Sequence, residues 1–152
     1  MAFIDFFYAY GSDDARFSGT HWIYNVHAPV GFGAPNRHED VAVVQTLLSG
    51  LARGVTGMRP MVIDGKFGPE THKQLLVYQK YVASQGARVV VDGRVDRARG
   101  ESGSISHCRY SIRYLNEGAH QMCPEYFPAL EVPAPNSLPP VLWAVRQRGV
   151  TD

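Results

Sequence analysis

The sequence predicts a mainly α-helical, single-domain protein, and three observations support this fold class. Residues 40–51 and 69–84 carry apolar side chains at the three- and four-residue spacing of a helix face. A third amphipathic segment, residues 104–116, follows a charged, glycine- and serine-rich loop. The chain has 152 residues and 45% hydrophobic content, which suits one domain with a buried core. We therefore expect a three-helix core with a hairpin-like extension before it and, after it, a Pro-rich wrap that ends in a short helix.

The N-terminal segment is aromatic-rich and predicts an extended, hairpin-like structure. Apolar and polar side chains alternate imperfectly over residues 2–10 and again over residues 21–26, with a polar, turn-like stretch between them. An isolated hairpin is only marginally stable, so we expect it to pack on the helices. Tyr8, Trp22 and Tyr24 are interpreted as packing residues, with an aromatic surface for stacking on sugar rings as the alternative.

Local signals set the ends of the central helices. Residues 29–36 are rich in glycine and proline and predict a linker before the first helix. Gly68 suits the N-cap of the second helix, and Pro69 suits its first position, where a missing N–H is no loss. We therefore expect the second helix to span residues 69–84.

The third helix is predicted over residues 104–116, with Gly118 as part of its stop signal. Its expected apolar stripe consists of Ile105, Cys108, Ile112 and Leu115. Tyr110 and Tyr114 lie four residues apart, so a helix places them together on a neighbouring face, where they could line a groove.

The C-terminal part predicts an irregular wrap. Residues 122–140 contain six prolines and cannot form a regular helix, whereas residues 137–148 predict a short final helix. The chain thus divides into an aromatic extension at residues 1–35, a helical domain at residues 36–121, and a Pro-rich strap with a short helix at residues 122–152, packed on the same domain.

The turn that precedes the second predicted helix is repeated later in the sequence. Val-Ile-Asp-Gly-Lys-Phe at residues 62–67 is repeated as Val-Val-Asp-Gly-Arg-Val at residues 90–95. Asp-Gly is a turn signal, because the Asp side chain bonds the local backbone and glycine tolerates positive φ. Repetition of such a unit is stronger evidence than either copy alone.

The order of helix, Asp-Gly-x-Phe-Gly-Pro-x-Thr loop, helix and second Asp-Gly loop resembles the peptidoglycan-binding domain often appended to bacterial cell-wall hydrolases. The resemblance covers roughly residues 38–117, matches that string in full at residues 64–71, and includes Gln45 and Tyr78-Gln79. It implies a compact three-helix core. The second loop departs from the pattern, because Asp96-Arg97 stands where Gly-Pro is expected.

By the resemblance, wall peptide or glycan is held in a shallow site near the helices and the Asp-Gly loops. Carried over position by position, the candidate ligand-binding residues are Asp64, Lys66, Phe67, Asp92 and Arg94. Tyr110 and Tyr114 are added by the face argument above. The alternative is that the two aspartates only organise turns and that Phe67 fills the core.

These observations lead to a non-catalytic module that targets bacterial peptidoglycan. The alternative is an interaction or adaptor protein that reuses the fold in a secretion or phage-like injection assembly, docking a partner through the aromatic N-terminal or Pro-rich C-terminal segment. A small wall hydrolase is a weaker third hypothesis, because no catalytic constellation is evident and neither end has room for a separate catalytic domain.

We expect no enzyme activity, no cofactor and no metal site. The nearest candidate for zinc combines His107-Cys108 with His120 and Cys123, but adjacent helical residues point about 100° apart. Both cysteines are expected to be reduced, since no export signal accompanies them.

Charge and hydropathy favour neither nucleic acid nor membrane as a partner. The formal net charge is +1, and no stretch approaches the roughly 20 apolar residues of a spanning helix. The first residues lack the basic n-region of a signal peptide, and Asp5 interrupts their apolar run. We therefore expect the chain to be cytoplasmic at synthesis, with delivery to the cell envelope or periplasm requiring a signal-independent route.

Overall fold

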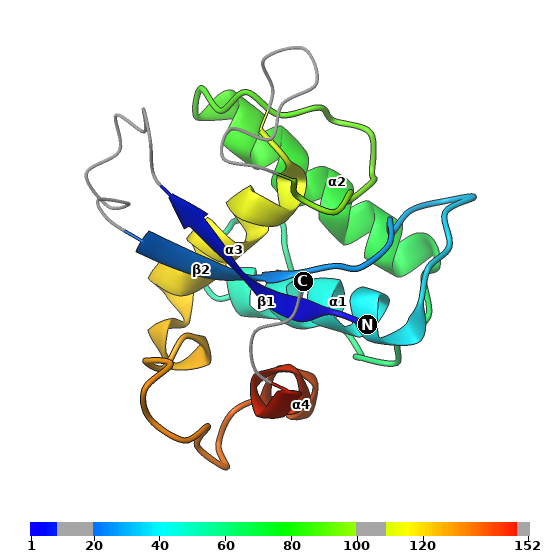
Figure 1. The fold of residues 1–152 in the computed structure, drawn as a ribbon. Helices are drawn as coiled ribbons and strands as arrows, with labels where there is room; N and C mark the ends of the chain where they lie inside the picture. Colours follow the sequence, from blue (N-terminus) through cyan, green and yellow to red (C-terminus); the bar gives the residue numbers. More distant parts are fainter. Residues whose placement is uncertain (9–19, 100–108, 149–152) are drawn as a thin grey trace.

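The fold combines four α-helices with a two-stranded antiparallel sheet, and a computed structural model describes it for residues 1–8, 20–99 and 109–148 (Figure 1). The elements in chain order are β1 (Phe3–Tyr8), β2 (Thr20–Asn25), α1 (His38–Leu51), α2 (Pro69–Ser84), α3 (Ser111–Met122), the 3₁₀ helix η2 (Pro124–Tyr126) and α4 (Pro140–Arg148). The predicted mainly helical class and the N-terminal hairpin are thus confirmed. None of the helices described in these ranges is long and apolar enough to cross a membrane.

The hairpin is part of the core. In Figure 1 the two strands lie across α1 and α3, with α4 below them. Residue Phe3 is opposite Asn25, and both Ile4 and Tyr24 are almost fully buried. The Tyr24 hydroxyl donates a 2.6 Å hydrogen bond to the carbonyl of Tyr126. Burial is the largest influence on this phenol and raises its pKa. Tyr24 is therefore a packing residue, as predicted, and not part of a sugar-stacking surface.

Helix α1 is the central element of the fold. Its apolar side chains face several directions, and α2, α3 and α4 all contact it. The buried apolar residues of α1 are Val41, Ala42, Val43, Val44, Leu47, Leu48 and Leu51. A helix that is apolar on most sides must be enclosed by other elements. One hydrophobic cluster accordingly includes residues from both strands and all four helices.

Helix α2 spans Pro69–Ser84, as the sequence predicts. Gly68 occupies the N-cap and Pro69 the first helical position, so the local signals are sufficient here. Tyr78 is buried, and its hydroxyl donates a 2.6 Å hydrogen bond to the carbonyl of Tyr114 on α3.

Helix α3 continues beyond its predicted end. It spans Ser111–Met122 and passes through Gly118, which the sequence suggests as a stop. A Cβ at Gly118 would overlap with the Tyr78 hydroxyl and lie 2.6 Å from a Leu51 methyl group. Gly118 therefore allows α1, α2 and α3 to approach closely, and this packing accounts for the wrong prediction. The predicted start is also wrong where the chain is described, because Arg109 and Tyr110 precede the first helical residue, Ser111. Residues 104–108 of the predicted helix, including Cys108, lie outside the described residues.

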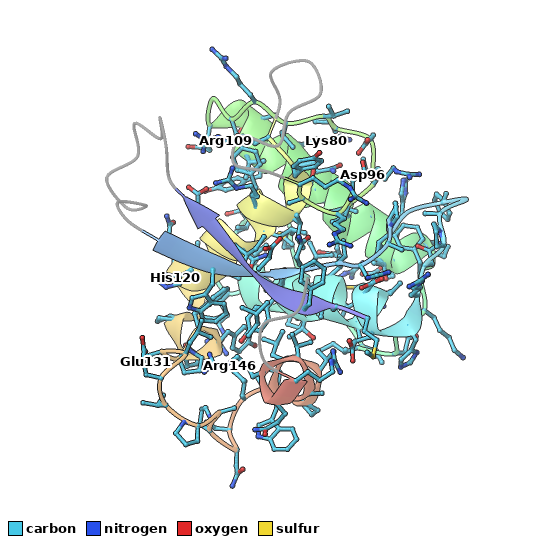
Figure 2. All side chains as sticks on the ribbon, viewed as in Figure 1. Lys80, Asp96, Arg109, His120, Glu131 and Arg146 are labelled. Atoms are coloured by element: carbon cyan, nitrogen blue, oxygen red, sulfur yellow. The ribbon has the colours of Figure 1, made fainter. Side chains whose placement is uncertain are left out.

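The C-terminal strap is fixed by Arg146 of α4 (Figure 2). Its guanidinium donates hydrogen bonds to the carbonyls of Pro128 and Ala129 and lies over the Trp22 ring, 5.2 Å from the centroid. Neighbouring Arg148 bonds Glu39 on α1 and the carbonyl of Ala2. The irregular strap and the short final helix agree with the sequence, and these two arginines join them to the rest of the fold.

Buried polar side chains connect the N-terminal segment to the helices. The Asn116 carboxamide of α3 bonds both the N–H and the carbonyl of Tyr24, at 2.8 and 2.9 Å. The Asp40 carboxylate of α1 accepts hydrogen bonds from the N–H groups of His27 and Ala28. Because unpaired buried backbone groups are costly, these contacts specify where the segment docks.

Candidate functional site

The first Asp-Gly turn is held by the side chain of Gln45 on α1. Gln45 is 1% exposed, and its Oε1 accepts hydrogen bonds from the N–H groups of Asp64 and Gly65, at 3.1 and 2.9 Å. Its Nε2 lies 3.0 Å from Asp64 Oδ1, 3.0 Å from the Lys66 carbonyl and 3.1 Å from Thr71 Oγ1. One carboxamide therefore joins α1, the turn and the first turn of α2.

The second Asp-Gly turn is held in the same way by Gln79 on α2. Gln79 is also 1% exposed, and its Oε1 accepts hydrogen bonds from the N–H groups of Asp92 and Gly93, at 3.2 and 2.8 Å. Its Nε2 lies 3.3 Å from Asp92 Oδ1, 3.1 Å from the Arg94 carbonyl and 2.9 Å from Ser111 Oγ. The repeat seen in the sequence is thus a repeat of hydrogen-bonded geometry.

Each turn also packs against a histidine two helical turns before its glutamine. Gly65 and Gly93 have φ angles of 69° and 67°, in the region that favours glycine. A Cβ at Gly65 would overlap with the His38 ring, and one at Gly93 would overlap with the His72 ring. Glycine suits the backbone conformation at both turns and leaves room for the imidazole beside each of them.

His72 brings the two turns onto one face of the molecule. Its ring lies 4.4 Å from the Phe32 centroid and 6.2 Å from the Phe67 centroid. Phe32 and Phe67 meet edge to face at 5.1 Å. We call the surface formed by Phe32, Lys66, Phe67, His72 and Arg94 the loop face. Phe32 comes from the segment before α1, Lys66 and Phe67 from the first turn, and Arg94 from the second.

The two cations of the loop face differ in solvent exposure and in hydrogen bonding. Lys66 is exposed. Arg94 is half-exposed, and its Nε donates a 2.9 Å hydrogen bond to Asp96 Oδ1. Its aliphatic part lies against Gly31, where an added Cβ would be 3.3 Å from Arg94 Cβ. Lys66 therefore has the cation that is easier for a ligand to reach.

The two predicted aspartates organise their turns. Asp64 Oδ1 accepts a 2.9 Å hydrogen bond from the Lys66 N–H, and Asp92 Oδ1 accepts one of 3.0 Å from the Arg94 N–H. The bond from Gln45, followed by that from Lys66, lowers the pKa of Asp64 below its ordinary value. Both carboxylates thus stabilise their turns. Contact of either one with a ligand stays a prediction.

The two predicted tyrosines lie at the start of α3, where Tyr110 is the N-cap and Tyr114 is within the helix. Tyr110 and Tyr114 are half-buried against the core at the start of α3. The Tyr114 hydroxyl is 3.4 Å from the carbonyl of Arg88, in the segment that leads to the second turn. Burial is the main influence on the Tyr114 phenol and raises its pKa. Their role in ligand binding also stays a prediction.

Sequence reasoning missed Phe32, His38 and His72. The histidines had a readable signal, because each precedes by two helical turns a glutamine named in the resemblance. Phe32 had none, since it lies between two glycines in a segment that the sequence predicts as a linker. That segment is instead folded: Val30 and Val95 exchange two backbone hydrogen bonds of 2.8 Å.

Metal and thiol chemistry receive little support from the part of the chain that is described. Within it, no group of three or more His, Cys, Asp or Glu side chains is arranged to hold a metal ion. Cys123 is a free, buried thiol 3.4 Å from the carbonyl of Gly50, and burial raises its pKa. A raised pKa disfavours the reactive thiolate. His107 and Cys108 lie outside the described residues.

Comparison of the chain with protein-family models, with curated proteins and with solved structures finds no match.

Proposed function

We propose that this chain is a non-catalytic module that binds bacterial peptidoglycan through the loop face. The observation that carries the proposal is the pair of glutamine-held turns. Asp64, Gly65 and Thr71, which belong to the motif of the resemblance, meet the Gln45 side chain, and a second glutamine repeats the arrangement at Asp92. A turn fixed by several hydrogen bonds holds the backbone beneath its next side chains in one conformation, which lowers the entropy lost on binding.

The side chains presented in this way suit the chemistry of the wall. The exposed cation of Lys66 follows the first turn and precedes the aromatic ring of Phe67. Peptidoglycan combines sugar rings, which stack on aromatic groups, with stem peptides that carry carboxylates. A cation beside an aromatic surface is complementary to both.

Binding is better supported than catalysis at this face. The carboxylates of Asp64 and Asp92 accept backbone hydrogen bonds, and Asp96 accepts one from Arg94. His72 is packed between Phe32 and the second turn. A general acid or base must reach its substrate, and each of these groups is already engaged in holding the loops.

Sedimentation with purified peptidoglycan sacculi tests the proposal. We expect the wild-type chain to pellet with sacculi and a Lys66→Ala/Arg94→Ala variant to remain largely in the supernatant. A Lys73→Ala/Lys80→Ala variant removes the same charge from exposed positions on α2 and should pellet like wild type. Equal retention of all three proteins would place binding elsewhere. A folded wild-type chain that stays in the supernatant would overturn the proposal.

A second candidate function is a protein-interaction module, as in a secretion or injection assembly. Two apolar pairs favour it: Val62-Ile63 and Val90-Val91 precede the two turns, and all four side chains are exposed. Exposed apolar groups at equivalent places suggest contact with a partner protein. Failure of the folded wild-type chain to bind sacculi would make this the preferred function.

A further inference from the structure

Phe32 is an apolar ring in an unusual position. It is 60% exposed, whereas many of the large apolar side chains that the structure describes are buried in one cluster. A phenyl ring in water costs free energy that burial would recover. The exposure of this ring therefore has its cause either in a function or in the structure of the loop that carries it.

The loop that carries Phe32 is rigidly built. The Asn36 carboxamide accepts a 2.8 Å hydrogen bond from the Gly31 N–H and donates one of 2.7 Å to the Gly31 carbonyl. Just before it, Val30 and Val95 exchange two backbone hydrogen bonds. The backbone on both sides of Phe32 is thus held, and the exposure of the ring is built into the fold.

The ring is also supported from the protein side. His72 lies 4.4 Å from its centroid, and Phe67 contacts it edge to face. Arg94 packs against neighbouring Gly31, and Lys66 is adjacent to Phe67. The result is one supported aromatic ring, with Arg94 beside the loop that carries it and Lys66 next in sequence to the phenylalanine that supports it.

We propose that Phe32 is a stacking platform for one N-acetylated amino-sugar ring of the glycan strand. This inference rests on the proposed function and names the part of the wall that the loop face binds. The C–H groups on one face of a pyranose pack on the aromatic ring, while its hydroxyl and acetamido oxygens accept hydrogen bonds at the rim from Lys66 and Arg94.

Two alternatives fit the platform less well. A stable protein partner needs about 800 Å² on each side, far more than one phenyl ring provides. A stem peptide would be recognised through its carboxylates by the two cations, and this leaves the exposed and supported ring unexplained. A single sugar ring matches both the size of the platform and its polar rim.

The test measures binding of a tetramer of N-acetylglucosamine to the full chain by calorimetry. We expect Phe32→Ala and Phe32→Leu each to weaken binding by about tenfold, as loss of one aromatic contact implies. Phe32→Tyr keeps a stacking ring and should bind like wild type. Trp143→Ala, which removes an exposed aromatic ring from α4, is the matched control and should have no effect.

Two further measurements separate this inference from the proposed function. Ring C–H resonances of the bound sugar should shift upfield in the wild-type complex and not in Phe32→Leu, because an aromatic ring current shields groups that stack on its face. The chain should also pellet with intact sacculi and bind, by calorimetry, the glycan strands that an amidase releases when it removes the stem peptides.

Each outcome bears on one proposal or on both. Retention by intact sacculi without binding to stripped glycan, or unchanged tetramer binding in Phe32→Ala and Phe32→Leu, would overturn the sugar platform and leave wall binding intact. Tetramer binding that depends on Phe32 without retention by sacculi would support the platform and overturn wall targeting. Absence of binding to sacculi, stripped glycan and tetramer would overturn both.

Discussion

The two Asp-Gly turns share one design but lead to different structures. The first turn passes directly into α2, whose Thr71 completes the set of groups around Gln45. The second turn is followed by residues 95–99, which pack on the N-terminal segment, and only then does Ser111 of α3 reach Gln79. The first turn thus presents side chains, whereas the second also anchors another part of the chain.

This difference explains why the second loop departs from the motif of the first. Asp96 and Arg97 stand where Gly-Pro is expected, and both have their own contacts. Asp96 accepts a hydrogen bond from Arg94, and Arg97 lies over the Phe3 ring, 4.6 Å from its centroid. Nearby, Ala98 exchanges hydrogen bonds with the Asn25 carboxamide. The residues after the second turn therefore form part of the surface on which the hairpin packs.

The largest expected effect comes from replacing each glutamine by methionine, which has a similar shape and no hydrogen-bonding amide. Gln45→Met and Gln79→Met should each lower the free energy of unfolding by about 3 kcal/mol, because several backbone groups lose their partner. Denaturation in urea measures this loss. Gln121→Met, at an exposed position on α3, is the control and should change stability little.

Amide hydrogen exchange then separates the two turns. Gln79→Met should speed exchange at Val30 and Val95, because their pairing depends on the second turn. Gln45→Met should leave those two amides protected. Equal exchange in both variants would show that the second turn does not anchor the N-terminal segment.

The next effect concerns the glycines of the two turns. Gly65→Ala should cost about 1 kcal/mol for the positive φ alone, because exposed His38 can move aside. Gly93→Ala should cost about 2 kcal/mol, since His72 is held by Phe32 and Phe67 and must be displaced as well. Thermal and urea unfolding give both values.

Two controls identify the source of the difference. Gly86 has a φ of 90° with nothing near a Cβ, so Gly86→Ala measures the backbone cost alone. Adding His72→Ala to Gly93→Ala should recover part of the lost stability, whereas adding His38→Ala to Gly65→Ala should recover little. Equal recovery at both turns would contradict the asymmetry proposed here.

The sequence predicts those elements whose causes are local. The start of α2 follows from Gly68 and Pro69, which act within one turn of the helix. The two Asp-Gly turns follow from the chemistry of two adjacent residues. The hairpin follows from alternation of apolar residues, although its burial depends on the helices.

The sequence fails where the cause lies in tertiary packing. Gly118 is typical of a helix end, but here it makes room for Tyr78 and Leu51 inside α3. Phe32 has no periodicity to mark it, and the pairing of Val30 with Val95 helps to place it on the loop face. Both depend on residues far away in the sequence, which local patterns do not report.

The smallest expected effect is a pH dependence that comes from Asp64. Its pKa in the folded chain lies below the ordinary value of 3.8, first because of the bond from Gln45 and then because of the Lys66 N–H. The unfolded chain therefore binds a proton at Asp64 more readily than the folded chain does. The stabilisation by Asp64 is present at neutral pH and is lost as pH falls through the folded pKa. Exposure of the carboxylate keeps the effect small.

Carboxyl-carbon NMR of the folded chain should show Asp64 titrating below its ordinary value. Asp64→Asn should remove part of the fall in unfolding free energy below about pH 4 and leave the rest of the profile in place. Asp92→Asn is the matched variant, because the corresponding bond from Gln79 is longer, at 3.3 Å against 3.0 Å. A greater loss of neutral-pH stability for Asp92→Asn than for Asp64→Asn would mean that the second turn depends more on its aspartate. The hydrogen-bond lengths predict the opposite order, since the shorter charge-assisted bond is the stronger one.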